Sequence, residues 1–230
     1  MRERFHYDLD ALHARINPRT KVIFLANPDN PTGTWFLERE LVHFLDVVPR
    51  DVLVVLDEAY VEYVDVAGFQ DSLRLRRQYP NLVVLRTFSK IYGLAGLRLG
   101  YAFARPEVIA YLDRVRAPFN VNLVAQAAGA AALGDEEHVA RSRALVHEER
   151  PFLEAGLRAL GATVVPSQAN FVLADFTGRP GMALFDALLR EAVVVRPVAG
   201  YGFPTAQRIT VGTRAENVKV LAALRKVLAR

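Results

Sequence analysis

Three polar segments in the first hundred residues hold side chains that could carry out covalent and acid–base chemistry. They are Asn27–Gly33, which includes Asn30, then Asp57–Tyr60, and finally the pair Ser89 and Lys90. A lysine in a dry site, or beside cationic or dipolar groups, loses its proton more easily and can then act as a nucleophile or a base. The chain has only four lysines, so a buried lysine would be conspicuous. These residue types indicate that the three segments could form a ligand-binding site.

Each segment also has an ordinary explanation when it is taken alone. Asn-Pro and Pro-Thr-Gly sequences are typical of turns. Asp57, after a strand, could cap a helix or bind a metal ion, and Lys90 could be a surface lysine, as most lysines are. The occurrence of all three in this order, each after an apolar run, favours one shared site.

The elements that must position these residues are short apolar strands in the first half of the chain. Continuous Val and Leu runs predict strands at 21–26, 52–56, 82–85 and 99–103, with an amphipathic helix over 34–48. Such runs, separated by helical stretches, indicate an α/β fold with a mostly parallel sheet covered on both faces. The polar segments follow the carboxyl ends of three successive strands, which is where open α/β sheets bind ligands.

The second half of the chain predicts a smaller α+β layer. We expect helices at 121–133, 136–160, 182–191 and 215–228, and strands at 163–165, 170–174, 192–196 and 207–211. Pro151 should mark a kink or joint in the long helix. The predicted division is therefore 1–115 for part of a large domain, 116–145 for a connecting helical region, and 146–230 for a small C-terminal domain.

Composition narrows the functional classes. Without cysteine there are no disulfides or thiolate metal sites, and no metal site is expected. The formal net charge is +4, but acids are interspersed and the only basic cluster is Arg74–Arg77, which disfavours nucleic-acid binding. No apolar signal region or run of membrane-spanning length occurs. We expect a cytoplasmic enzyme without a membrane partner.

The segment from Thr87 to Tyr101 is the part of the chain whose sequence is most specific for one protein family. Together with Asn30, with Asp57 to Tyr60 and with the C-terminal stretches 195–203 and 208–213, it resembles the fold-type-I pyridoxal-phosphate aminotransferases, and among them the histidinol-phosphate aminotransferases. The resemblance implies a large domain of the PLP-binding type, pyridoxal 5'-phosphate as cofactor and a homodimer. It also implies transamination of histidinol phosphate with glutamate and 2-oxoglutarate in histidine biosynthesis.

Other readings share much of this pattern. An aromatic amino-acid aminotransferase or a threonine-phosphate decarboxylase of the same fold would keep the cofactor residues and differ in its substrate arginines. An inactive truncated remnant that serves only as a binding or structural protein is the alternative from another class.

The resemblance assigns catalytic roles to Lys90, Asp57 and Tyr60. Lys90 forms a Schiff base with the cofactor aldehyde and then moves a proton between carbons. Asp57 lies by the pyridine nitrogen and keeps it protonated, so that the ring can accept electrons. Asn30 and Tyr60 hydrogen-bond the phenolic oxygen of the ring.

The same resemblance assigns anion-binding roles to hydroxyl and guanidinium groups. Ser89 and Arg98, with help from Thr87, bind the cofactor phosphate, for which arginine offers bidentate contacts. Arg208 receives the anionic end of the substrate. Arg196 recognises the substrate phosphate or a side-chain carboxylate.

Members of the family carry a long segment ahead of the position of Tyr7. It supplies further strands of the large-domain sheet, an aromatic ring that stacks on the cofactor, and a helix N-terminus at the phosphate. We expect this sequence, as it stands, to leave the large-domain sheet incomplete at its N-terminal side, with an open sheet edge, a pocket open on one side and weak cofactor binding.

Overall fold

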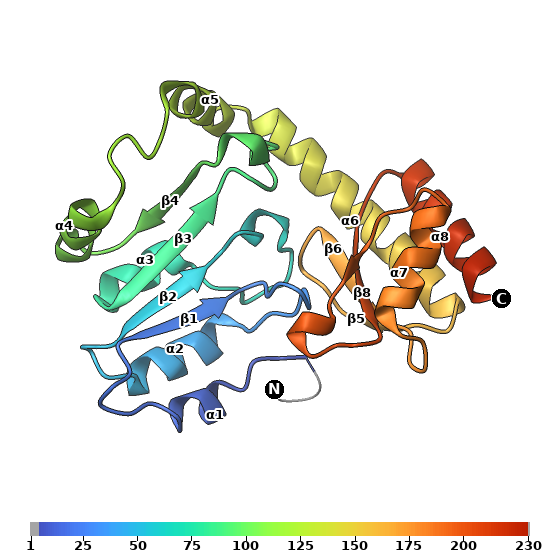
Figure 1. Cartoon of the computed structure of the whole chain (residues 1–230). Coiled ribbons are helices and arrows are strands. Elements are labelled where there is room, and N and C mark those ends of the chain that lie inside the picture. Colours follow the sequence, from blue (N-terminus) through green and yellow to red (C-terminus); the bar gives the residue numbers. More distant parts are fainter. Residues whose placement is uncertain (1–4, 230) are drawn as a thin grey trace. The chain divides into compact units, whose positions relative to one another are not determined.

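The computed structural model describes residues 5–229, which form two compact units (Figure 1). The first unit comprises the chain up to Pro28 together with Trp35–Ala140. The second comprises Asp29–Thr34 and the chain from Arg141 onward. The three-part division at 115 and 145 stays a prediction.

A four-stranded sheet organises the first unit. Its order is β1 (Val22–Ala26), β2 (Leu53–Asp57), β3 (Leu82–Thr87) and β4 (Gly100–Phe103). The first three strands are parallel, whereas β4 runs antiparallel to β3. The predicted α/β fold with a mostly parallel sheet is confirmed, and the antiparallel strand lies at one edge.

Helices cover one face of this sheet through an apolar core. They are α1 (Leu9–His13), α2 (Glu38–Val47) and α3 (Ser72–Gln78), which lie on the same side of the strands in Figure 1. The strand residues with inward-facing side chains alternate, as a pleated sheet requires. The central buried residues of this core are Leu25, Leu41, Phe44, Leu45, Val54, Leu56, Leu75, Leu82 and Val84. Each fully buried side chain of this size contributes about 1.5–3 kcal/mol.

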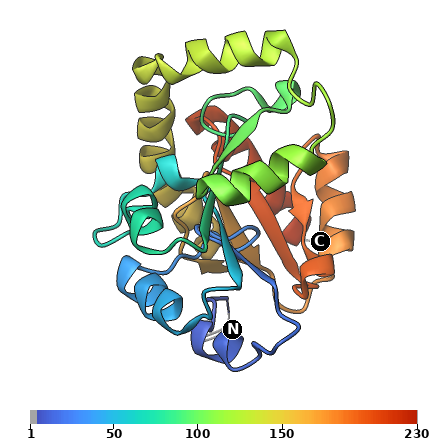
Figure 2. The same ribbon diagram turned by 90° about the vertical axis from the view of Figure 1, so that its left-hand side faces the viewer.

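The opposite face of the sheet is covered over β2 and β3. There α4 (Pro106–Val115) packs Val108 against Val55 and Val83, and it lies in front of the strands in Figure 2. Phe24 of β1 points to the same face and is 71% exposed.

The first unit continues through short and long helices. The 3-10 turns η1 (Val61–Tyr63) and η2 (Ala95–Leu97) follow β2 and β3, and α5 (Leu123–Leu133) leads to α6 (Glu136–Ala159), of which only the residues up to Ala140 belong to the first unit. The long helix α6 includes Pro151 in its interior, so the proline does not end it.

The second unit has its own antiparallel sheet. The order is β5 (Thr163–Val165), β6 (Phe171–Asp175), β8 (Ala206–Thr210) and β7 (Arg196–Pro197), with α7 (Gly181–Arg190), α8 (Arg214–Leu228) and the turn η3 (Ala199–Tyr201). Its core includes Leu153, Leu157, Val172, Leu188, Ile209 and Leu224.

The predicted strand at 192–196 is wrong. Residues 191–192 form a turn after α7, where the Ala192 N–H donates to the Leu189 carbonyl and Ala192 has a φ of 55°. Val193 and Val195 bury their side chains without pairing in the sheet. The valine run reflects burial, and the strand is confined to Arg196–Pro197.

Across residues 5–229, none of the helices combines the length and the apolar character that a bilayer crossing would need.

Candidate active site

The ends of two neighbouring parallel strands bring Asp57 and the lysine segment together. Asp57 is the last residue of β2 and is paired with Leu85 of β3, which ends two residues later at Thr87. The Lys90 Nζ lies 5.3 Å from the centroid of the Tyr60 ring, and its charge acts on the Asp57 carboxylate. Tyr60 is buried. The structure thus unites the three predicted catalytic residues in the first unit.

A compact turn holds Lys90 in place. The Thr87 Oγ1 accepts a hydrogen bond from the Ser89 N–H at 3.0 Å, and the Gly93 N–H donates to the Lys90 carbonyl at 2.9 Å. Phe88, between them, is buried and packs on the Tyr101 ring with centroids 5.4 Å apart. A buried aromatic anchor in the turn thus fixes the chain just before the lysine.

Arg98 adopts a left-handed backbone conformation, with φ 53° and ψ 47°. Its Nη1 donates to the Ala95 carbonyl at 2.8 Å, and its remaining donors have no partner within the described part of the chain. A non-glycine residue in this region costs free energy, and such residues concentrate at functional sites. The guanidinium is exposed and open to an anion.

The environment of Asp57 decides how readily it keeps a proton. Burial raises the pKa of the Asp57 carboxyl above its ordinary value, while the hydrogen bond from the Ala59 N–H at 3.0 Å and the positive charge of Lys90 lower it. These opposing effects leave a carboxyl group whose protonation depends on its cationic neighbour.

Replacing Lys90 with methionine should raise the pKa of Asp57 further. The variant removes the positive charge that favours the carboxylate and keeps an unbranched side chain of similar length. Titrating the carboxyl carbon of Asp57 by NMR, in both proteins without cofactor, measures the shift. An unchanged or lowered pKa would show that the two side chains do not interact in solution.

Asn30 and Arg208 pair with each other in the second unit. The Arg208 Nη1 donates to the Asn30 Oδ1, and the guanidinium carbon lies 5.0 Å from the centroid of the Phe171 ring. Asn30 belongs to the segment Asp29–Thr34, which is bonded to the second unit through the Gln168 N–H, a donor to the Gly33 carbonyl at 2.9 Å. The position of Asn30 opposite Arg208 therefore depends on this attachment. Gly33 has a φ of 76°, and a Cβ there would collide with the side chain of residue 167, so only glycine fits.

Arg196 lies directly across from Arg208 in the register of β7 and β8. Arg196 is exposed, whereas Arg208 is half-buried. Two guanidinium groups on adjacent strands repel each other unless an anion is bound between them. The predicted substrate arginines are therefore neighbours in one sheet.

The nine residues predicted for the site fall into two groups. Asp57, Tyr60, Thr87, Ser89, Lys90 and Arg98 lie in the first unit, and Asn30, Arg196 and Arg208 lie in the second. Each group is assembled within its own unit, on strands and on the turns that follow them.

Glu58 was not predicted to have a role, although it stands inside a predicted motif. It is fully buried and bonded to residues of β3, of the segment before α3 and of the first turn of α3. The sequence could have indicated this, because neighbouring residues at a strand end point to opposite faces. If Asp57 faces the ligand, then Glu58 faces the interior, where a carboxylate needs buried hydrogen-bond partners.

The donors in the first unit fit a ligand that carries an electrophilic carbonyl, a basic ring nitrogen and a phosphate. Neither the Lys90 amine nor the Ser89 hydroxyl has a hydrogen-bond partner among residues 5–229. One oxygen of Asp57 accepts from Ala59, which leaves its second oxygen for a ligand. The residues present thus match the functional groups of pyridoxal phosphate. In the same range, no three His, Cys, Asp or Glu side chains gather in a way that could hold a metal ion.

Comparison with known proteins agrees with this geometry. Residues 1–224 match the family described as aminotransferase class I and II. The chain is 75% identical over 228 residues to a histidinol-phosphate aminotransferase of Anaeromyxobacter sp. (strain Fw109-5), covering 99% of this chain and 63% of that protein. It is 54% identical over 224 residues to histidinol-phosphate aminotransferase 2 of Pseudomonas fluorescens (strain Pf0-1), covering 97% and 60%.

A solved structure also shares the fold. The histidinol-phosphate aminotransferase of Sinorhizobium meliloti in complex with pyridoxal-5'-phosphate superimposes with a TM-score of 0.88 at 32% identity, over 96% of this chain and 61% of that one. The chain thus spans about 60% of the length of the relatives it matches. Because the family match extends over nearly the whole sequence, the chain belongs to the aminotransferase class I and II family.

Proposed function

We propose that the chain carries catalytic machinery of a pyridoxal-phosphate-dependent aminotransferase of histidine biosynthesis. Its substrates would be histidinol phosphate and imidazole-acetol phosphate, with glutamate and 2-oxoglutarate as the second pair. The observation that carries the proposal is the placement of Asp57 and Lys90 at adjacent strand ends, beside the Tyr60 ring. The names of the similar proteins support the choice of substrate. A cytoplasmic location belongs to the same proposal.

The first unit would hold the cofactor. Pyridoxal phosphate, when bound, supplies an aldehyde and a ring that withdraws electrons from the substrate carbon. The Lys90 amine would bond to the aldehyde and later hold and deliver the proton at the substrate carbon. The Asp57 carboxylate would keep a proton on the ring nitrogen, and the Tyr60 hydroxyl would donate to the phenolic oxygen.

The phosphate would be bound by the donors at the end of β3. The hydroxyls of Thr87 and Ser89 and the guanidinium of Arg98 are of the types that bind phosphate oxygens. Arg98 matters most, because its fork of N–H groups remains open in the described part of the chain.

The second unit would bind anionic groups of the substrates. Arg208 and Arg196 stand opposite each other in the β7–β8 register, which suits a carboxylate or a phosphate. The role of Asn30 toward the phenolic oxygen remains a prediction from the family resemblance, since its amide oxygen is bonded to Arg208.

The test is a spectroscopic titration followed by half-reactions. Purified protein titrated with pyridoxal phosphate should develop the absorbance band of a lysine-bound cofactor. Adding histidinol phosphate should then convert the spectrum faster than phenylalanine or threonine phosphate. Faster conversion by phenylalanine would favour an aromatic aminotransferase. Release of carbon dioxide from threonine phosphate would favour a decarboxylase. The absence of any band would favour an inactive remnant.

The proposed working form is a homodimer, and an exposed apolar surface on α4, α5 and the loop between them supports it. Phe119 in this loop is 96% exposed and has a φ of 57°. Surfaces of this kind are typical of protein–protein interfaces. The apolar side chains of this α4–α5 surface are Tyr111, Val115, Phe119, Leu123 and Val124.

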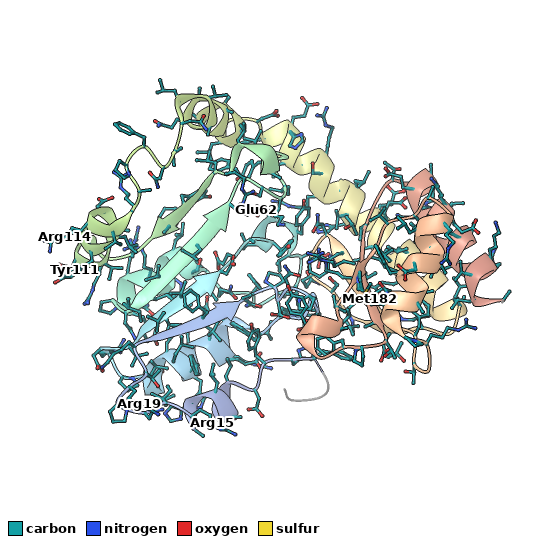
Figure 3. All side chains as sticks on the ribbon, in the orientation of Figure 1. Arg15, Arg19, Glu62, Tyr111, Arg114 and Met182 are labelled. Carbon is teal, nitrogen blue, oxygen red and sulfur yellow. The ribbon has the colours of Figure 1, made fainter. Side chains whose placement is uncertain are left out.

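Replacing Phe119 with aspartate should weaken self-association. A large aromatic at an interface often contributes about 2 kcal/mol or more, so the dissociation constant should rise by roughly thirtyfold or more. Met182 on α7 is a matched control, since it is also an exposed apolar residue but belongs to the second unit. Figure 3 labels it, together with Tyr111 and Arg114 of α4. Sedimentation equilibrium measures both variants. A monomeric parent protein, or equal effects of Phe119→Asp and Met182→Asp, would contradict this interface.

A further inference from the structure

Glu58 is the centre of a buried polar network behind the candidate active site. Its carboxylate is fully buried and accepts four hydrogen bonds. Gln70 Nε2 donates at 3.0 Å and Ser72 Oγ at 2.9 Å. Arg86 donates through Nε at 3.1 Å and through Nη2 at 3.0 Å, and the two residues also form an ion pair. The partners come from β3, from the first residue of α3 and from the segment that leads into α3.

The network extends from Glu58 to the end of β1. Gln70 Oε1 accepts from the Asn27 Nδ2 at 2.7 Å, and Asn27 is itself fully buried. The Asn27 side chain also donates to the Phe36 carbonyl at 2.9 Å and accepts from the Phe36 N–H at 3.1 Å. Side chains from the ends of β1, β2 and β3 are thus joined by one continuous chain of hydrogen bonds.

Two members of this network are adjacent to residues of the proposed site. Glu58 directly follows Asp57, and Arg86 directly precedes Thr87, whose hydroxyl organises the turn before Lys90. The backbone repeats the connection, since the Glu58 N–H donates to the Leu85 carbonyl and the Asn27 N–H to the Asp57 carbonyl. Movement of Glu58 against Arg86 would therefore change the separation of the Asp57 and Lys90 side chains.

A role in stability alone is a weak explanation for this network. Replacing a buried ion pair by apolar side chains is often neutral or stabilising, because taking the charges out of water costs about as much as their attraction returns. Burial raises the pKa of Glu58, while the hydrogen bond from Gln70, the charge and hydrogen bonds of Arg86 and the hydrogen bond from Ser72 lower it. A fully buried carboxylate does not touch substrate. What the network does provide is one fixed geometry.

We propose that Glu58 is a positioning residue, which fixes the strand ends that carry Asp57 and Lys90 by tying β2 to β3 and to the start of α3 with the residues just before it. The proposal rests on the proposed function, because it assigns Glu58 a task for the same cofactor-binding residues.

The test compares Glu58→Gln with Glu149→Gln. Glu149 is a matched control in the second unit, where it is buried and accepts hydrogen bonds from Arg214 Nε at 2.8 Å and Asn217 Nδ2 at 2.9 Å. Both substitutions remove a buried carboxylate bonded to an arginine and an amide. Urea unfolding first establishes how much stability each variant loses.

Two measurements then separate positioning from stability. Hydrogen–deuterium exchange of the cofactor-free proteins should be about ten- to a hundredfold faster at residues 57–60 and 86–90 in Glu58→Gln, as expected when a buried hydrogen-bond network is left unsatisfied. The dissociation constant for pyridoxal phosphate should rise about tenfold in Glu58→Gln. Glu149→Gln should show neither change, at a comparable loss of stability.

Unchanged exchange at 57–60 and 86–90 in folded Glu58→Gln, or the same changes in Glu149→Gln, would overturn the proposal. If Glu58→Gln does not fold, Ser72→Ala replaces it, since it removes only one of the four donors. The same pattern with smaller changes would then support the proposal, and unaltered exchange would overturn it. A parent protein that binds no pyridoxal phosphate contradicts the proposed function, and the exchange data still decide the role of Glu58.

Discussion

Replacing Lys90 with alanine is expected to abolish transamination and to remove the bond to the cofactor that borohydride can trap. Lys90 is the amine at the strand ends that bear Asp57 and Tyr60, and alanine offers neither a nucleophile nor a base. The activity should fall below detection, because the proposed reaction assigns both the bond to the cofactor and the proton transfer to this amine.

Mass spectrometry after borohydride reduction locates the cofactor on the chain. Lys21→Ala is the control, because Lys21 is an exposed lysine of the same unit that pairs with Asp51. It should keep full labelling and turnover. Labelling of Lys21, Lys219 or Lys226 in the parent protein would remove Lys90 from the mechanism.

Replacing Asp57 with asparagine should preserve folding but lose most of the turnover. Among residues 5–229 the Asp57 carboxylate accepts a hydrogen bond only from the Ala59 N–H, and asparagine keeps the shape of the side chain. A neutral amide cannot hold a proton on the ring nitrogen. The cost should be roughly 3–4 kcal/mol of transition-state stabilisation, or about a hundred- to a thousandfold in rate, similar to the removal of a preorganised donor.

Rates under saturating pyridoxal phosphate measure this effect separately from cofactor affinity. Asp51→Asn is a matched control, since Asp51 precedes the same strand and is exposed. Near-parental turnover of Asp57→Asn with cofactor bound would show that Asp57 does not act on the ring.

The strands of the first unit were predictable because strands that are buried on both faces consist almost entirely of apolar residues. Val54, Leu56, Val83 and Val84 are buried by helices on the two faces of the sheet, which selects continuous apolar runs. The polar residues at the strand ends follow from the same topology. The sequence therefore predicted both the sheet and the edge near which the proposed cofactor residues of the first unit lie.

Two helices of the first unit that bury few side chains were not predicted. In α3 the arginines at 74, 76 and 77 read as a basic cluster around the buried Leu75, although Arg76 is itself half-buried. The helix α4 has apolar residues at helical spacing, but it buries only Val108 and leaves Tyr111 and Val115 exposed.

Contacts between distant residues could not be predicted either. The Asn30–Arg208 pair joins residues 178 positions apart, and the Glu58 network depends on Gln70 and Arg86, whose side chains give no local sign of their partners. Composition and periodicity report the environment of one segment, whereas these bonds depend on how several segments assemble.

The assignment of Asp29–Thr34 to the second unit, although both flanking segments belong to the first, has a consequence for dissecting the protein. A polypeptide that starts at Arg141 would lack the Gly33 carbonyl, to which the Gln168 N–H donates, and the Asn30 amide, to which Arg208 donates. Excising the second unit for NMR, or grafting it from a relative to change substrate choice, therefore requires transplanting this six-residue loop as well. A chimaera that exchanges the C-terminal portion alone would join a foreign sheet to a loop selected for another partner, and Gly33 would be the position at which the mismatch first appears.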